Sequence, residues 1–156
     1  MAGDTEAEED ARDLADCRPS PVVSAAAGAL VFAGVGCLML ALQTLLVIGP
    51  SRTVLASSVL AVEALLGAAL VVSAVLMLKL RVLPAVLGVG LAFFTAFSIL
   101  GWTLFAMTRG LFSILGFAVP GLCMIAGLLS LLAIGPAQRA SAARRRLRER
   151  GVSLGL

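Results

Sequence analysis

The hydropathy of the chain is dominated by four long apolar segments separated by short polar breaks. The segments cover about residues 22–48, 53–78, 82–107 and 110–135. Each is longer than the ~20 residues that a helix needs to cross a ~30 Å hydrocarbon core. Only helices satisfy their own backbone groups in lipid, and the segments are too long to be strands of a membrane barrel. The pattern therefore predicts four transmembrane α-helices.

The breaks between the segments indicate how the helices are connected. Gly49-Pro50 follows the first segment and Gly135-Pro136 follows the fourth, and a glycine followed by a proline is typical of a helix end. Connections this short make neighbouring helices antiparallel. We predict an all-α integral membrane protein: an antiparallel bundle of four transmembrane helices at residues 22–136, between tails at residues 1–21 and 137–156.

The charge distribution supports this interpretation. Only 13% of the residues are charged and 60% are hydrophobic, whereas soluble domains are about one quarter charged. Residues 22–136 contain few charges, too few to cover the surface of a water-soluble domain. These are Arg52, Glu63, Lys79, Arg81 and Arg109.

The two tails carry opposite charges. Residues 1–21 contain seven acids and two arginines, and we predict that they are disordered. Residues 137–156 contain six arginines and Glu149, and we predict a basic helix beside the membrane. With four spans, both tails lie on one side, which then holds ten lysines and arginines against two on the other. The positive-inside rule makes that side cytoplasmic.

The basic tail suggests a lipid partner. Arginines next to a membrane attract anionic lipids with ~1 kcal/mol each, and the residues in question are Arg144, Arg145, Arg146 and Arg148. Pairing with the acidic tail and a role only in fixing topology are the alternatives. Nucleic acid is not an expected partner, because the patch lies against a membrane and has no aromatic residues beside it.

Glu63 is the only acid between residues 22 and 136. It lies about ten residues into its segment, which is ~15 Å along a helix axis and close to the bilayer midplane. A charged acid there costs ~2.5–3.5 kcal/mol. We therefore expect Glu63 to be protonated, hydrated, bound to a cation or paired with a basic residue of another protein.

The candidate intramembrane site contains three further residues. Gly67 lies one helical turn beyond Glu63 and leaves room for an approaching backbone or ion. Thr95 and Ser98 of the third segment are predicted to reach the same height, whereas Thr44 of the first segment is expected nearer the outer face.

Small residues and one proline predict how the helices pack. Ala33 and Cys37 belong to a four-residue spacing of small residues in the first segment, and Gly88 and Ala92 to another in the third. Such rows let helices approach closely in lipid. Pro120 should kink the fourth helix and free the carbonyl of Gly116, which then needs another donor.

The sequence favours a non-enzymatic protein. It has no histidine, and we find no nucleophile–base pair, metal cluster or phosphate loop, so no catalytic residue, metal or cofactor is predicted. We expect a non-catalytic subunit, scaffold or regulator of a larger membrane complex, bound to other membrane subunits or to itself. The alternative is a small proton- or cation-coupled transporter or channel that uses Glu63. In having four short helices and one membrane glutamate, the chain is similar to small multidrug transporters, although their glutamate lies in the first span.

The expected location is the cell membrane. Arginine outnumbers lysine by eleven to one, amid abundant alanine, leucine, valine and glycine. This bias favours a GC-rich genome and hence a bacterial inner membrane. A eukaryotic membrane is the alternative.

Overall fold

The computed structural model describes residues 11, 13–15, 17, 20–48, 54–79, 82–111 and 113–150. These residues are helical apart from caps and turns, and no strand occurs among them. Four of the helices are long and apolar enough to cross a membrane, which confirms the predicted all-α class of multi-pass membrane protein. They are α2 (Pro21–Ile48), α3 (Val54–Leu78), α4 (Val82–Thr108) and α5 (Ile114–Glu149).

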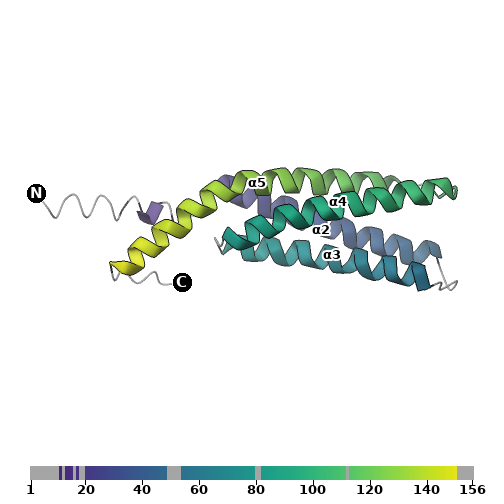
Figure 1. Cartoon of the computed structure of the whole chain (residues 1–156), viewed down its shortest axis with the longest axis horizontal. Coiled ribbons are helices and arrows are strands. Elements are labelled where there is room, and N and C mark those ends of the chain that lie inside the picture. Colours follow the sequence, from purple (N-terminus) through teal and green to yellow (C-terminus); the bar gives the residue numbers. More distant parts are fainter. Residues whose placement is uncertain are drawn as a thin grey trace, which may run out of the picture.

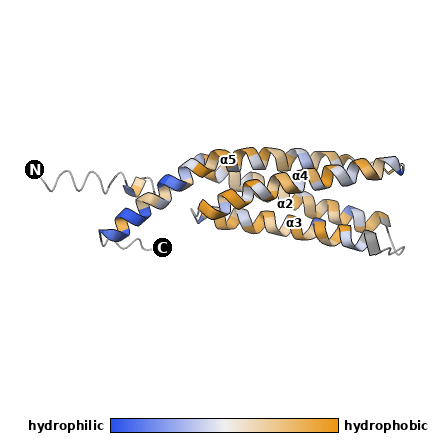
Figure 2. Ribbon diagram, viewed as in Figure 1, coloured by the Kyte–Doolittle hydropathy of each residue, from blue (hydrophilic) through white to orange (hydrophobic). Residues whose placement is uncertain are grey.

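The four helices lie side by side along the long axis of the molecule (Figure 1). Helix α2 packs against α3 and α5, and α4 packs mainly against α5. The contact between α3 and α4 is much less extensive. Figure 2 shows that the side-by-side part is apolar along its length, whereas the far end of α5 is hydrophilic.

The interior is made of small side chains and the outside of large apolar ones. Ala26, Ala33, Ala92 and Ala126 are completely buried. Large apolar residues face outward on every helix, among them Phe32, Leu46, Leu65, Phe94 and Leu132. In water so large an apolar surface would cause aggregation, whereas in lipid it is the expected exterior, with small residues allowing the helices to approach.

Helices α2 and α3 come closest at a pair of glycines. A Cβ atom added to Gly67 would lie 2.8 Å from the carbonyl oxygen of Gly34, and one added to Gly34 would lie 2.7 Å from that of Gly67. Gly67 therefore makes room for the backbone of α2. Of the small residues predicted to pack, Ala33, Cys37, Gly88 and Ala92 are all buried.

Helices α4 and α5 are joined by a hydrogen bond at the proline of α5. Pro120 has no N–H, so the carbonyl of Gly116 loses its usual helical donor. The Thr103 hydroxyl of α4 donates to this carbonyl at 3.0 Å. The Gly116 carbonyl thus has the hydrogen-bond donor that the sequence predicted it would need.

The prediction that the fourth helix ends at Gly135-Pro136 is wrong. Helix α5 continues through both residues to Glu149, and Gly135 does not have the positive φ of a helix-ending glycine. A proline removes one backbone donor but does not stop a helix that is stabilised elsewhere. Here the following residues are good helix formers, and Ala137 and Ala140 are buried. The corresponding prediction for Gly49-Pro50 lies outside the described residues.

The end of α5 leaves the side-by-side part of the molecule (Figure 1). Its C-terminal portion is inclined to the rest of the helix, and a proline such as Pro136 is a usual cause of such a bend. Most of the predicted disordered tail lies outside the described residues. The described residues 11 and 13–15 of that tail are helical, and Figure 1 shows them beside the end of α5.

Candidate functional site

Glu63 is buried in the interface between α2 and α3. Its side chain is 4% exposed, and its Oε2 atom accepts a hydrogen bond from the Thr44 hydroxyl of α2 at 3.2 Å. Thr44 was expected nearer the outer face, but it is the hydrogen-bond partner that the structure shows for this acid. A hydroxyl donor can stabilise the neutral or the ionised form of a carboxyl group. A carboxyl group buried without any hydrogen-bond partner would destabilise the protein much more.

Two of the four residues predicted for the site come together. Glu63 and Ser98 line the same cavity. Thr95 is completely buried, but its hydroxyl donates to the Leu91 carbonyl of its own helix at 2.7 Å. Gly67 faces Gly34 at the helix crossing. Neither Thr95 nor Gly67 lines the cavities beside Glu63.

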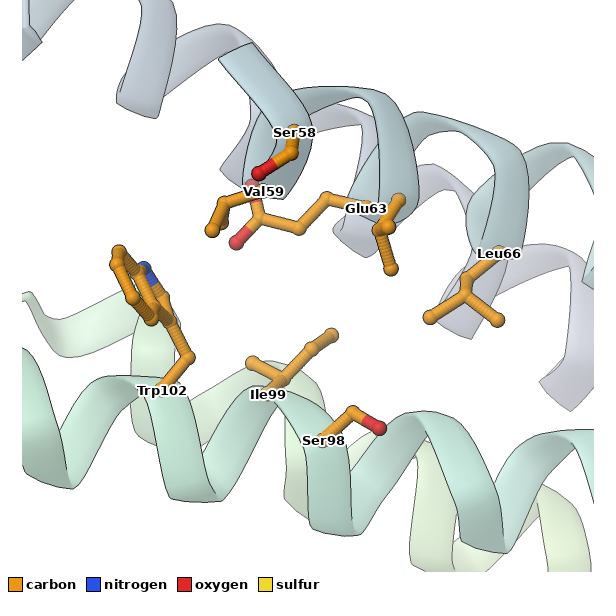
Figure 3. A pocket seen from close by; sticks show the side chains of 8 residues that line it. Ser58, Val59, Glu63, Leu66, Ser98, Ile99 and Trp102 are labelled. Atoms are coloured by element: carbon orange, nitrogen blue, oxygen red, sulfur yellow. The ribbon is translucent and has the colours of Figure 1, made fainter. Parts of the chain in front are cut away.

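The first cavity lies between α3 and α4 and has a volume of about 230 Å³. Figure 3 shows the Glu63 carboxyl reaching along this cavity toward Ser58 and the Trp102 indole. Ser98 enters from α4, and the remaining walls are apolar. The residues that line it are Ser58, Val59, Val62, Glu63, Leu66, Ser98, Ile99 and Trp102.

A second cavity, of about 140 Å³, lies where α2, α3, α4 and the start of α5 meet. Glu63 and Trp102 line both cavities, so the acid lies between them. Polar side chains from all four helices surround this second space. They are Gln43, Thr44, Glu63, Trp102, Thr103 and Ser113.

Hydrogen bonds fix the polar wall of the second cavity. Ser113 is the N-cap residue of α5, and its hydroxyl accepts from the Gly116 N–H at 3.3 Å. The same hydroxyl donates to Gln43 Oε1 of α2 at 3.0 Å. Together with the bond from Thr103 to Gly116, these contacts join α2, α4 and α5 around the cavity.

The chemistry of this arrangement is that of oxygen donors around one carboxyl group. Among the described residues no group of three or more histidine, cysteine or acidic side chains could hold a metal ion. Hydroxyl, amide and carboxyl oxygens suit water, a proton or a hard cation rather than a transition metal.

Sequence reasoning left two polar residues of α2 out of the site, because it expected them at a different height from Glu63. Gln43 and Thr44 are the only polar residues in the second half of α2, and this scarcity was the signal that could have identified them. Trp102, which lines both cavities, was not among the residues predicted for the site. Ser113 lies in a short connection, where a helix cap is the ordinary expectation.

The arginines predicted to bind lipid have different surroundings. Arg144 donates through NH1 to the Lys79 carbonyl at 3.2 Å, and Arg145 pairs with Glu149 at 3.0 Å. Arg146 pairs with Asp13 at 3.5 Å. Arg148 is exposed. Pairing of the basic tail with the acidic one, an alternative from the sequence, is therefore present at Arg146.

Comparison with models of protein families, with curated proteins and with solved structures finds no match for this chain. The helices themselves define its class, a multi-pass α-helical membrane protein.

Proposed function

We propose that the chain is a non-catalytic subunit, scaffold or regulator of a larger membrane complex. Its four spans form an antiparallel bundle in the cell membrane, with both termini in the cytoplasm. The observation that supports this role is a groove between α3 and α4. Besides the Glu63 cavity, a cavity of about 670 Å³ lies between the same two helices. We call the surface formed by the residues that line these two cavities the α3–α4 groove.

The groove suits a transmembrane helix of a partner protein. Its lining is mostly apolar, and the exceptions are Ser58, Glu63, Ser73, Ser98 and the indole N–H of Trp102. Apolar side chains at the surface of one membrane helix can pack against another helix by van der Waals contact. The chain itself has no lysine or arginine within its four apolar segments. A lysine, arginine or hydroxyl residue of the partner would therefore supply the further donor that a buried acid requires.

Co-purification after gentle extraction tests this role. The tagged chain should retain a membrane protein in a constant ratio, identified by mass spectrometry. Val62→Trp, which fills the groove, should remove that protein. Val35→Trp is the matched control, because Val35 is an outward-facing residue of α2. A strictly monomeric wild-type chain that retains biological activity would contradict the proposal.

The second candidate is a proton- or cation-coupled transporter or channel. It is supported by the polar cavity that places side chains from four helices around Glu63. A carboxyl group between two cavities can exchange a proton or cation with water on either side. Flux into proteoliposomes should then fall strongly in Glu63→Gln, which keeps a hydrogen-bond acceptor but cannot ionise. Equal flux in both proteins would exclude this function.

We also propose that Arg144, Arg145, Arg146 and Arg148 bind the phosphate groups of anionic lipids. Their position near the end of a membrane helix supports this role, because basic residues there lie within reach of the headgroups. A lipid-binding α5 would fix the orientation of the subunit in a bacterial inner membrane, and it is compatible with either function of the spans.

A further inference from the structure

Helix α5 keeps a buried face in its basic C-terminal part. Ala140, Ala143 and Leu147 are 2%, 1% and 0% exposed. They are spaced by three and four residues and so share one side of the helix. A basic helix that projected alone into water would expose this side. Another part of the chain must therefore cover it.

The N-terminal segment, defined here as the described residues 11, 13–15 and 17, lies beside this part of α5 (Figure 1). Asp13 is only 6% exposed, and its Oδ1 atom lies 3.5 Å from NH1 of Arg146. The Cys17 N–H donates to the Asp13 carbonyl at 3.1 Å, which continues the helical turn. An acid is thus held against the basic helix on the segment that precedes the first span.

The arginines of α5 flank its apolar face on both sides. Arg139 and Arg146 are seven residues apart and share one flank, and Arg144 and Arg148 are four apart and share the other. An apolar stripe between two rows of basic residues is the pattern of a helix that lies in the membrane interface. In the structure, Asp13 of the N-terminal segment pairs with Arg146 at one edge of this stripe.

We propose that the N-terminal segment covers a lipid-binding face of α5, and that anionic phospholipids displace it by taking over Arg146. This inference rests on the proposed lipid binding by α5. In the covered state Asp13 pairs with Arg146. In the open state the phosphate of a phospholipid replaces the Asp13 carboxylate, and Leu147 and Ala143 enter the interface.

The exchange is favourable because the covering contact is weak. Arg146 is 60% exposed, and an ion pair with one exposed partner contributes little and is screened by salt. Phosphate groups can bind arginine through two hydrogen bonds. Several arginines can also bind anionic lipid at once, so their contributions add. Release should therefore rise with the fraction of anionic lipid.

A spin label on Cys17 measures the release. Cys17 is the partly exposed cysteine of the chain, whereas Cys37 and Cys123 are buried among the spans. The full chain is placed in nanodiscs of phosphatidylcholine with increasing phosphatidylglycerol. We expect the ratio of mobile to immobile label to rise about two- to fivefold with the anionic lipid, in line with loss of a weak ion pair.

Two variants should release the segment without anionic lipid. Asp13→Asn and Arg146→Gln each remove one partner of the pair and should raise the mobile fraction in neutral nanodiscs. Arg145→Gln is the matched control: it makes the same charge change on the same helix, but Arg145 pairs with Glu149. If Arg145→Gln releases the segment as strongly as Arg146→Gln, the specific exchange at Arg146 is wrong.

Lipid binding is measured separately, by native mass spectrometry of the retained phosphatidylglycerol. Retention of this lipid together with an immobile Cys17 label would overturn the displacement and leave lipid binding intact. No preference for phosphatidylglycerol over phosphatidylcholine would overturn both. Asp13 lies outside the spans, so Asp13→Asn should fold even if Arg146→Gln does not. The Asp13→Asn variant then tests the release on its own.

Discussion

At the scale of residues, several polar groups within the spans have partners on other helices that the sequence could not identify. Thr44 lies on another helix from Glu63, and Thr103 on another helix from Gly116. The sequence shows that a membrane acid needs a partner and that Pro120 frees a carbonyl. It does not show which face of a neighbouring helix supplies the donor, because that depends on how the helices are rotated against each other.

The bond from Thr103 to Gly116 gives a prediction at this scale. Thr103→Val removes the hydroxyl donor and leaves the carbonyl freed by Pro120 without a partner. We expect the free energy of unfolding to fall by ~0.6–2 kcal/mol, the range for hydrogen bonds between membrane helices. Unfolding in mixed micelles with increasing dodecyl sulfate would measure the loss, and Thr103→Ser should retain most of the wild-type stability.

A double-mutant cycle identifies the cause of that loss. Pro120→Ala returns an N–H that can bond to the Gly116 carbonyl within α5. In the Pro120→Ala background, Thr103→Val should therefore cost less than in the wild type. Equal costs in the two backgrounds would mean that Thr103 acts through packing instead.

At the scale of elements, hydropathy predicts the helices well and their ends less well. The starts and ends of α2, α3 and α4 lie within one residue of the predicted segments. The error at Gly135-Pro136 arises because a local stop signal competes with burial of Ala137 and Ala140, which is a property of the folded chain. Gly67 was recognised from the sequence as a position of close approach. Its partner Gly34 could be identified only from the structure, because the pairing is also a property of the folded chain.

The crossing of α2 and α3 predicts a large effect from a small substitution. Gly67→Ala would place a methyl group 2.8 Å from the Gly34 carbonyl oxygen, so the helices must separate. Because neither backbone can move away alone, we expect a destabilisation of ~1–3 kcal/mol, the usual cost of overpacking. The same unfolding measurement in mixed micelles applies.

Gly90→Ala is the control for this substitution. Gly90 is in the middle of α4, is exposed, and has no atom within 4 Å of an added Cβ. Alanine there should be neutral or should stabilise the helix by ~0.5–1 kcal/mol. If Gly67→Ala were as well tolerated as Gly90→Ala, the glycine pair would not determine how closely α2 and α3 pack.

At the scale of the whole molecule, the distribution of charge and the positions of the helix ends predict the same orientation in the membrane. The start of α2, the end of α3 and the end of α5 lie toward one end of the molecule (Figure 1). This end carries the basic part of α5, and Figure 2 shows it as the hydrophilic part of the chain. The opposite end holds the α4–α5 turn with Arg109 and Gly110. The positive-inside rule therefore predicts that the basic end is cytoplasmic.

Two cysteine positions at opposite ends test this orientation. Native Cys17 is half-buried at the basic end, and Leu111→Cys places a thiol on an exposed residue of the α4–α5 turn. In intact cells or spheroplasts, a membrane-impermeant maleimide should label Leu111→Cys but not Cys17. Permeabilisation should make Cys17 reactive, while Cys37 and Cys123 stay protected within the spans. Labelling of Cys17 in intact cells would place the basic helix outside, away from the lipid surface that its arginines are proposed to bind.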